Sequence, residues 1–141
     1  MNSSALSFVS DNDLRYAEVM SSPKQDKARE YRIDMEAVVD AYDETERAMG
    51  WYCYLEDRIK PPFNARCVTR HAISPLKIGQ AVKVLGMAPA EECESDMFVM
   101  IEYDGDELGV PLAQLAPVAC DAATKEAIAD WHYWVARGYE F

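Results

Sequence analysis

The sequence predicts an α+β protein in which a small SH3-like antiparallel β-barrel is flanked by an N-terminal and a C-terminal helix. Three observations support this class: apolar residues at helical spacing over 34–58, short alternating segments over 63–110, and a second helical pattern over 121–138. A chain of 141 residues is long enough for one domain with its own core. We therefore expect a single domain over residues 31–141, preceded by a flexible polar extension over residues 1–30.

The first predicted helix runs from about Asp34 to Arg58. Asp34 is a suitable N-cap, and Pro61 with Pro62 ends the helix. Gly50 weakens the helix by roughly 1 kcal/mol relative to alanine, and a bend or break there would let a second apolar stripe form. Two apolar stripes are predicted to face the core: Met35, Val38, Val39, Tyr42, Met49 and Cys53, and then Trp51, Leu55 and Ile59.

Four or five short strands are predicted in the middle of the chain, with segments at 63–68, 81–85, 97–103 and 107–110. Asp104-Gly105 is a favourable two-residue hairpin turn between the last two. The same turn shares D-x-D and a later glycine with an EF-hand loop. Leu108 and Leu115 occupy two of the ligand positions, however, so a hairpin is expected instead. Short strands with tight connections favour a small antiparallel barrel.

The last helix is predicted to begin at Asp121 or Thr124 and to end near Gly138. Its apolar stripe must pack on the barrel, on the first helix, or on both, and comprises Ala127, Ile128, Trp131, Trp134 and Val135.

The charge of the chain restricts its partners. Twenty-five acidic residues against fourteen basic ones give a formal net charge of −11, which repels nucleic acid and anionic lipid and attracts cations. No apolar run approaches the roughly 20 residues of a membrane span, and no signal peptide is recognisable at the N-terminus. The four cysteines are unevenly spaced without a C-x-x-C motif, which favours reduced thiols in a cytoplasm over a zinc site.

No catalytic motif is found in the sequence. His71 and His132 are the only histidines, and neither has an evident partner for acid–base chemistry. Hydrolase and nucleotide-binding signatures are missing from the sequence, so we expect a protein without enzymatic activity.

An oxygen-ligated metal is better supported. Calcium binds six to eight oxygens from carboxylates, carbonyls and water. The densest source is the predicted loop that contains Glu91, Glu92, Glu94 and Asp96, whose mutual repulsion a divalent cation would relieve. The alternative is a solvated turn that protects a sheet edge from aggregation, and the residues alone do not decide between the two.

A second candidate is the acidic part of the first helix, with Asp40, Asp43 and Glu44. Asp40 and Glu44 lie one turn apart, about 6 Å along the axis, but a solvated helical face is the simpler explanation for them. Asp57 belongs to a third acidic pair with Glu56. It is roughly 25 Å from Asp40 along an unbroken helix, so the two cannot share one ion unless the helix breaks sharply.

Several blocks of the sequence, in order, resemble the CcbP-type calcium-binding proteins known from cyanobacteria. The similarity spans about residues 34–141. The blocks are residues 40–42, 47–52, 54–57, 62–63, 74–76, 84–87, 92–94, 97–99, 110–112, 114–115, 127–135, 138–139 and 141.

The resemblance implies Ca²⁺ binding without an EF-hand and without an enzymatic activity. It implies Glu92 and Glu94 as candidate ligands because they lie within a matching block; Asp40 and Asp57 also match. Glu91, Asp96, Asp43 and Glu44 are candidates from their sequence proximity alone. We expect a calcium buffer or sensor that uses surface carboxylate clusters.

An alternative function is an SH3-like adaptor that binds a protein partner in an aromatic groove. Core packing is the competing explanation for these aromatic residues, which are Trp51, Tyr52, Tyr54, Trp131, Tyr133 and Trp134.

Overall fold

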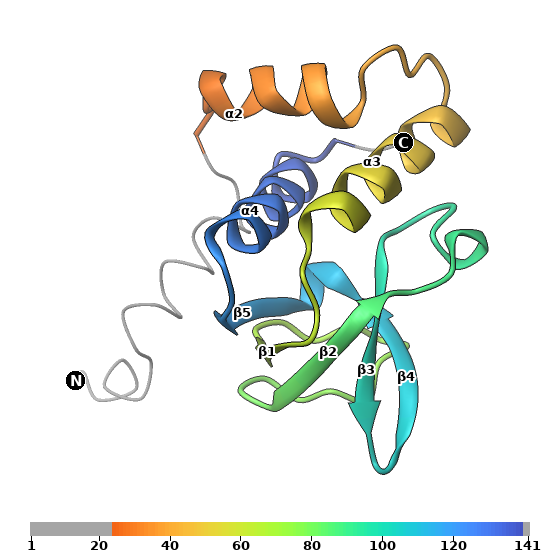
Figure 1. Cartoon of the computed structure of the whole chain (residues 1–141), viewed down its shortest axis with the longest axis vertical. Coiled ribbons are helices and arrows are strands. Elements are labelled where there is room, and N and C mark those ends of the chain that lie inside the picture. Colours follow the sequence, from red (N-terminus) through yellow and green to blue (C-terminus); the bar gives the residue numbers. More distant parts are fainter. Residues whose placement is uncertain (1–23, 140–141) are drawn as a thin grey trace.

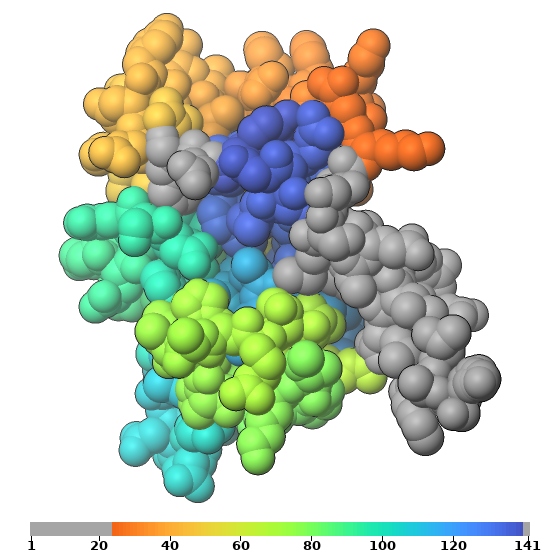
Figure 2. Space-filling model, turned by 180° about the vertical axis from the view of Figure 1, so that it is seen from behind, coloured from red at the N-terminus to blue at the C-terminus, as the bar shows by residue number. Residues whose placement is uncertain are grey.

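The computed structural model describes residues 24–139 and shows helices gathered at one end of the molecule and a β-sheet at the other (Figure 1). The same division is visible from behind in the space-filling view (Figure 2). Within this range no helix combines the length and the apolar character that crossing a membrane would require.

The N-terminal part forms three helical segments where the sequence predicts one helix from Asp34 to Arg58. They are α2 (Lys27–Arg32), the π-helical turn η2 (Ile33–Ala37) and α3 (Glu44–Arg58). In the intervening loop Asp40 has a φ of 56°, which a right-handed helix cannot accommodate. Asp43 then starts α3 as its N-cap by accepting a hydrogen bond from the Glu46 N–H at 2.8 Å. The break therefore lies before α3 and not at Gly50.

This break also changes which apolar residues face the core. Much of the first predicted stripe is exposed, namely Met35, Val39, Tyr42, Met49 and Cys53. The second stripe is buried as predicted and comprises Trp51, Leu55 and Ile59; Ile33, Ala37 and Ala48 join it. A periodic pattern read across 34–58 assumes one helical phase, whereas the loop gives η2 and α3 independent phases.

Gly50 lies inside α3, where the missing side chain lets α3 approach η2. A Cβ at this position would lie 2.2 Å from the Ala37 carbonyl oxygen. We expect Gly50→Ala to lower the free energy of unfolding by about 2 kcal/mol, because separating the two backbones outweighs the better helix propensity of alanine. Urea denaturation would measure this loss, with the exposed neighbour changed by Met49→Ala as the control. A Gly50→Ala protein as stable as the wild type would contradict the close approach.

The predicted boundary at residue 30 falls inside α2. Asp26 caps this helix, and its Arg29 and Arg32 both contact Asp130 of the last helix. Residues 26–30 therefore pack with the last helix as part of the folded domain. Residues 1–23 of the predicted extension lie outside the described residues.

The sheet contains five antiparallel strands: β1 (Phe63–Cys67), β2 (Ala81–Met87), β3 (Phe98–Tyr103), β4 (Asp106–Pro111) and β5 (Leu115–Ala119). Their order is β4-β3-β2-β1-β5, which confirms the antiparallel α+β class. Because β4 and β5 form opposite edges, the sheet is open and not the closed SH3-like barrel that the sequence predicts. Side chains from the helices, including Trp51 and Ile128, share one core with the strands.

The β3–β4 connection is the predicted hairpin. Asp104 and Gly105 have φ values of 53° and 83°, as the two central residues of a type I′ turn require. Strands flank the turn on both sides, so it is not an EF-hand.

Helix α4 (Ala122–Ala136) follows β5, and Asp121 caps it by accepting a hydrogen bond from the Thr124 N–H at 2.9 Å. Gly138 has a φ of 82° beyond its end, as predicted for a C′ residue. The aromatic residues proposed for a peptide groove are core residues instead. Five of the six are buried, and Trp51 packs edge-to-face on Trp131 with ring centroids 5.0 Å apart. The adaptor hypothesis based on them is therefore not favoured.

His132 on α4 is buried, and its Nε2 lies 2.6 Å from the Leu115 carbonyl oxygen. Burial lowers the pKa of His132 from 6.5 to about 4. The unfolded chain therefore binds a proton in this pH range that the folded chain excludes, so stability should fall as pH drops from 6.5 towards 4. We expect this loss to be on the order of 3 kcal/mol and to be reduced in His132→Gln, as urea midpoints at several pH values would measure. If the stability of both proteins depended equally on pH, the loss could not be assigned to His132.

Candidate metal centre

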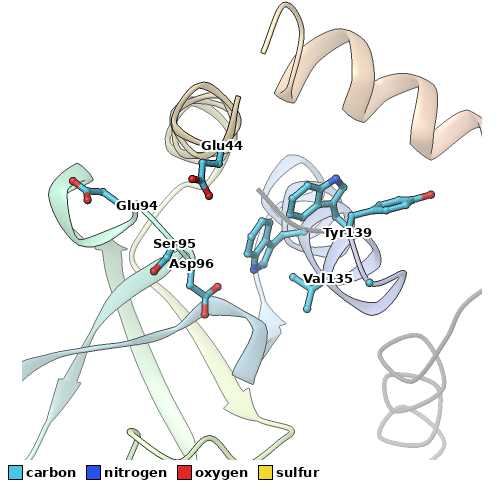
Figure 3. Close-up of a pocket in the computed structure, with 9 residues that line it drawn as sticks. Glu44, Glu94, Ser95, Asp96, Val135 and Tyr139 are labelled. Carbon is cyan, nitrogen blue, oxygen red and sulfur yellow. The ribbon is translucent and has the colours of Figure 1, made fainter. Parts of the chain in front are cut away.

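A pocket of about 450 Å³ lies where α3, the β2–β3 connection and the end of α4 meet (Figure 3). Acidic and hydroxyl side chains form one side, and aromatic and apolar residues form the other. The lining residues are Glu44, Glu94, Ser95, Asp96, Trp131, Trp134, Val135, Gly138 and Tyr139.

Glu44 reaches the pocket from the first turn of α3. Asp43 fixes the start of that turn as the N-cap, and Glu46 reaches back to accept a hydrogen bond from the Tyr42 N–H at 3.0 Å. Acidic side chains in a first turn are favoured by the positive end of the helix dipole. The Glu44 side chain is exposed, and Figure 3 shows its carboxylate directed toward the side of the pocket formed by Ser95 and Asp96.

The β2–β3 connection brings the other acidic residues. It begins near Ala88, whose carbonyl accepts a hydrogen bond at 2.9 Å from the Tyr52 hydroxyl of α3. It then forms the single turn η3 (Ala90–Glu92) and passes through the buried Cys93, whose Sγ lies 3.4 Å from the Phe98 N. These contacts anchor both ends of the connection and present the segment between Cys93 and Phe98 to the pocket.

Asp96 is the best-anchored carboxylate of the pocket. Its side chain is partly buried, and Oδ1 accepts a hydrogen bond from the Met97 N–H at 2.8 Å. Burial raises the pKa of Asp96, while the Met97 hydrogen bond and the nearby His71 oppose that rise. Glu94 is exposed and extends toward the outer side of the connection, away from Asp96 (Figure 3).

The structure thus brings together three acidic residues from the two predicted clusters: Glu44 with Glu94 and Asp96. Asp43 precedes Glu44 but has one oxygen engaged in the helix cap. Asp40 is exposed in the loop before it and does not line the pocket.

The other predicted ligands lie elsewhere. Glu91 and Glu92 are exposed on η3, and Glu92 lines a different hollow. Asp57 is near the opposite end of α3, about 20 Å from Glu44 along the helix axis, so it cannot contribute to the same site.

The pocket also contains residues that the sequence does not single out for a metal site. Ser95 offers a hydroxyl oxygen, and Trp134 and Tyr139 form part of the apolar side. Their ring centroids are 6.1 Å apart, and the Tyr139 hydroxyl donates a hydrogen bond to Glu30 at 2.8 Å. No local motif distinguishes these residues, because only the packing of α4 against α3 brings them to the pocket.

The oxygen atoms that line the pocket are of the type that binds a hard cation. Carboxylate and hydroxyl oxygens are typical calcium ligands. Among residues 24–139, no three His, Cys, Asp or Glu side chains are grouped closely enough to hold a metal ion as they stand. An ion would therefore require the exposed Glu44 and Glu94 side chains to rotate toward Asp96.

The sequence profile of the CcbP calcium-binding family, described as calcium binding, matches residues 31–135. This chain belongs to the CcbP family. The match begins in the last turn of α2 and ends one residue before the end of α4, so it includes every pocket-lining residue except Gly138 and Tyr139. Calcium is the ion that this family binds, which confirms the Ca²⁺ expected from the sequence.

Two solved structures resemble this one. The crystal structure of Anabaena CcbP has 43% sequence identity and a TM-score of 0.76, covering 86% of this chain and 99% of the other. A calcium-binding protein in the calcium-binding form also has 43% identity, with a TM-score of 0.74 and coverage of 83% and 96%. No curated protein sequence matches significantly.

Proposed function

We propose that this CcbP-family protein binds Ca²⁺ between the first turn of α3 and the β2–β3 connection. Glu44, Glu94 and Asp96 would supply carboxylate oxygens, and Ser95, backbone carbonyls and water would complete the shell. The observation that supports this proposal is that Glu44 and Asp96, far apart in the sequence, line the same pocket.

Asp96 and the two glutamates have different roles in this proposal. Asp96 is held in place by Met97 and keeps a second carboxylate oxygen available for the ion. Glu44 and Glu94 are exposed, and exposed side chains change rotamer within nanoseconds. The ion would first meet the negative field of the chain and then recruit the two glutamates around Asp96. An open site of this kind should have an affinity on the order of micromolar or weaker.

We further propose that the protein acts as a calcium sensor. The proposed ligands come from two separate segments, so a bound ion would change the distance between α3 and the β2–β3 connection. Trp131 and Trp134 line the same pocket and would respond to that change.

The proposed location is a reducing cytoplasm, because all four cysteines lie within the described residues and are free. The excess of acidic residues disfavours nucleic acid and anionic membranes as partners. We propose no catalytic role, since the buried His132 serves as a core residue.

Calorimetric titration of Ca²⁺ into the chelator-treated protein, with excess Mg²⁺, tests the proposal. We expect saturable binding. A parallel titration with Tb³⁺ locates the ion, because tryptophan excitation sensitises terbium emission only at short range and Trp131 and Trp134 line the pocket. Saturable calcium binding without sensitised terbium emission would place the ion elsewhere, and no saturable binding would overturn the calcium proposal for this chain.

A further inference from the structure

A second hollow, of about 500 Å³, lies on the outer face of the β3–β4 pair beside the β2–β3 connection. Its lining is mainly apolar with one acidic residue, and comprises Ile73, Ala88, Pro89, Glu92, Phe98, Met100 and Gly109. It shares no lining residue with the pocket of Glu44 and Asp96. We call this hollow the Met100 groove.

The floor of the Met100 groove is made by strand residues that do not belong to the fully buried core. Phe98 and Met100 alternate along β3 with Val99 and Ile101, which are fully buried on the opposite face. Ile73, which is 72% exposed, forms part of the wall. A large aliphatic side chain at this exposure gains little from the fold and is available for contact with another molecule.

Gly109 keeps the groove open. It pairs with Met100 across β3 and β4, so a side chain at either position would occupy the same face. A Cβ at Gly109 would meet only the Met100 Sδ, at an ordinary 3.6 Å, and its φ is not left-handed. Neither packing nor backbone conformation therefore requires glycine here, and its effect is to leave space above Met100.

The charge beside the groove selects the partner. Glu92 lines it and is exposed, Glu91 precedes it, and the chain carries a net charge of −11. A second copy of this chain, a nucleic acid or an anionic lipid would all be repelled. A peptide segment with a lysine or arginine beside a large apolar residue would complement both the acid and the apolar floor.

We propose that the Met100 groove binds a basic, apolar segment of a partner protein. An apolar side chain of the partner packs on Phe98 and Met100, and a neighbouring cationic side chain pairs with Glu92. Methionine adapts to differently shaped apolar side chains and suits such a floor.

Calcium should weaken this binding, an effect that rests on the proposed function above. Glu92 belongs to the same connection as Glu94 and Asp96, so a divalent ion there reduces the negative field that attracts the cationic segment. Coupling between two ligands is reciprocal, so the partner would also lower the affinity for calcium.

A synthetic probe peptide, acetyl-Gly-Lys-Leu-Lys-Leu-Lys-Gly-amide, tests the groove. Contacts of the peptide are detected by NMR, as shifts of the methyl signals of protein labelled at its methionine and isoleucine methyl groups. We expect shifts at Met100 and Ile73 but not at Met35 and Met49, which are exposed on the helical side. Matched peptides with glutamate for lysine, or serine for leucine, should bind at least about tenfold more weakly, because each lacks one half of the recognition.

Variants of the groove provide the second measurement. Gly109→Val, which fills the space, and Ile73→Ser, an exposed change that the fold should tolerate, are each expected to weaken the probe several-fold. Glu92→Gln should weaken it more than Glu107→Gln, which removes the same charge from the exposed β3–β4 hairpin. Three outcomes would each overturn the proposal that the Met100 groove binds the probe. They are shifts confined to the helices, equal affinity for the serine peptide, and an Ile73→Ser protein with unchanged affinity for the probe.

Saturating calcium is expected to weaken the probe by about two- to fivefold, as its charge reduces the field at Glu92. If calcium binds without changing the affinity for the probe, the proposed coupling is wrong and the proposed calcium site still stands. If the protein binds the probe at Met100 but binds no calcium, the proposed function is wrong and the proposed peptide groove still stands.

Discussion

Asp130→Asn is expected to lower the free energy of unfolding by about 3 kcal/mol or more, because it breaks a buried charge network. Asp130 is fully buried on α4. Its Oδ1 accepts hydrogen bonds from Arg29 at 2.8 Å and Arg32 at 2.7 Å, and its Oδ2 accepts from Arg32 at 2.9 Å and from the Tyr54 hydroxyl at 2.5 Å. An asparagine amide would place donor hydrogens against these donors. The network joins α2 and α3 to α4, so the loss should appear in all three helices.

Glu126→Gln is the matched control for this prediction. Glu126 is on the same helix and its Oε1 lies 3.7 Å from the Arg32 Nε, but its side chain is 51% exposed. Removing its charge should cost no more than about 1 kcal/mol, since solvent already screens that pair. Urea denaturation of both variants gives the comparison, and hydrogen exchange would show whether α2 opens first. Equal losses for the two variants would mean that burial of Asp130 contributes nothing to the strength of the network.

The parts of the fold that the sequence predicts correctly depend on local signals. The Asp121 cap, the Gly138 terminus and the Asp104-Gly105 turn each act within a few residues, and each lies where expected. The open sheet is not predicted, because whether β4 and β5 meet depends on contacts between distant parts of the chain and not on any short segment. Gly50 is misread for the same reason: its effect on helix propensity is local, whereas its contact with Ala37 is tertiary.

The candidate site also has one part that local sequence predicts and one part that depends on tertiary packing. Acidic residues in the Glu91–Asp96 connection are evident from the sequence as a dense cluster. The approach of Glu44 to Asp96 is not, because it requires the break before α3 and the packing of α3 beside the connection. Glu92 and Asp96 illustrate the limit further: they are four residues apart but line two different hollows. Sequence proximity therefore identifies the connection but not which of its side chains share a pocket.

Replacing the two carboxylates on either side of the pocket, with Glu44→Gln and Asp96→Asn, is expected to produce the largest functional effect. Each single change should weaken calcium binding by at least about tenfold, since a hydrogen bond or contact to a charged group contributes about 1.5–3 kcal/mol. Asp57→Asn, at the far end of α3, removes the same charge and should leave the affinity nearly unchanged. Calorimetry with Ca²⁺ in excess Mg²⁺ measures all three.

The stability of the ion-free variants separates a lost ligand from a lost fold. Because burial raises the pKa of Asp96, the ionised carboxylate is less favourable in the folded chain than in the unfolded one at neutral pH. Asp96→Asn removes that cost and can still accept the Met97 hydrogen bond through its amide oxygen, so the ion-free protein should be at least as stable as the wild type. A large loss of calcium affinity with unchanged stability would assign Asp96 to the ion. Unchanged affinity in both Asp96→Asn and Glu44→Gln would exclude this pocket, because no arrangement of the proposed ligands leaves both carboxylates without contact to the ion.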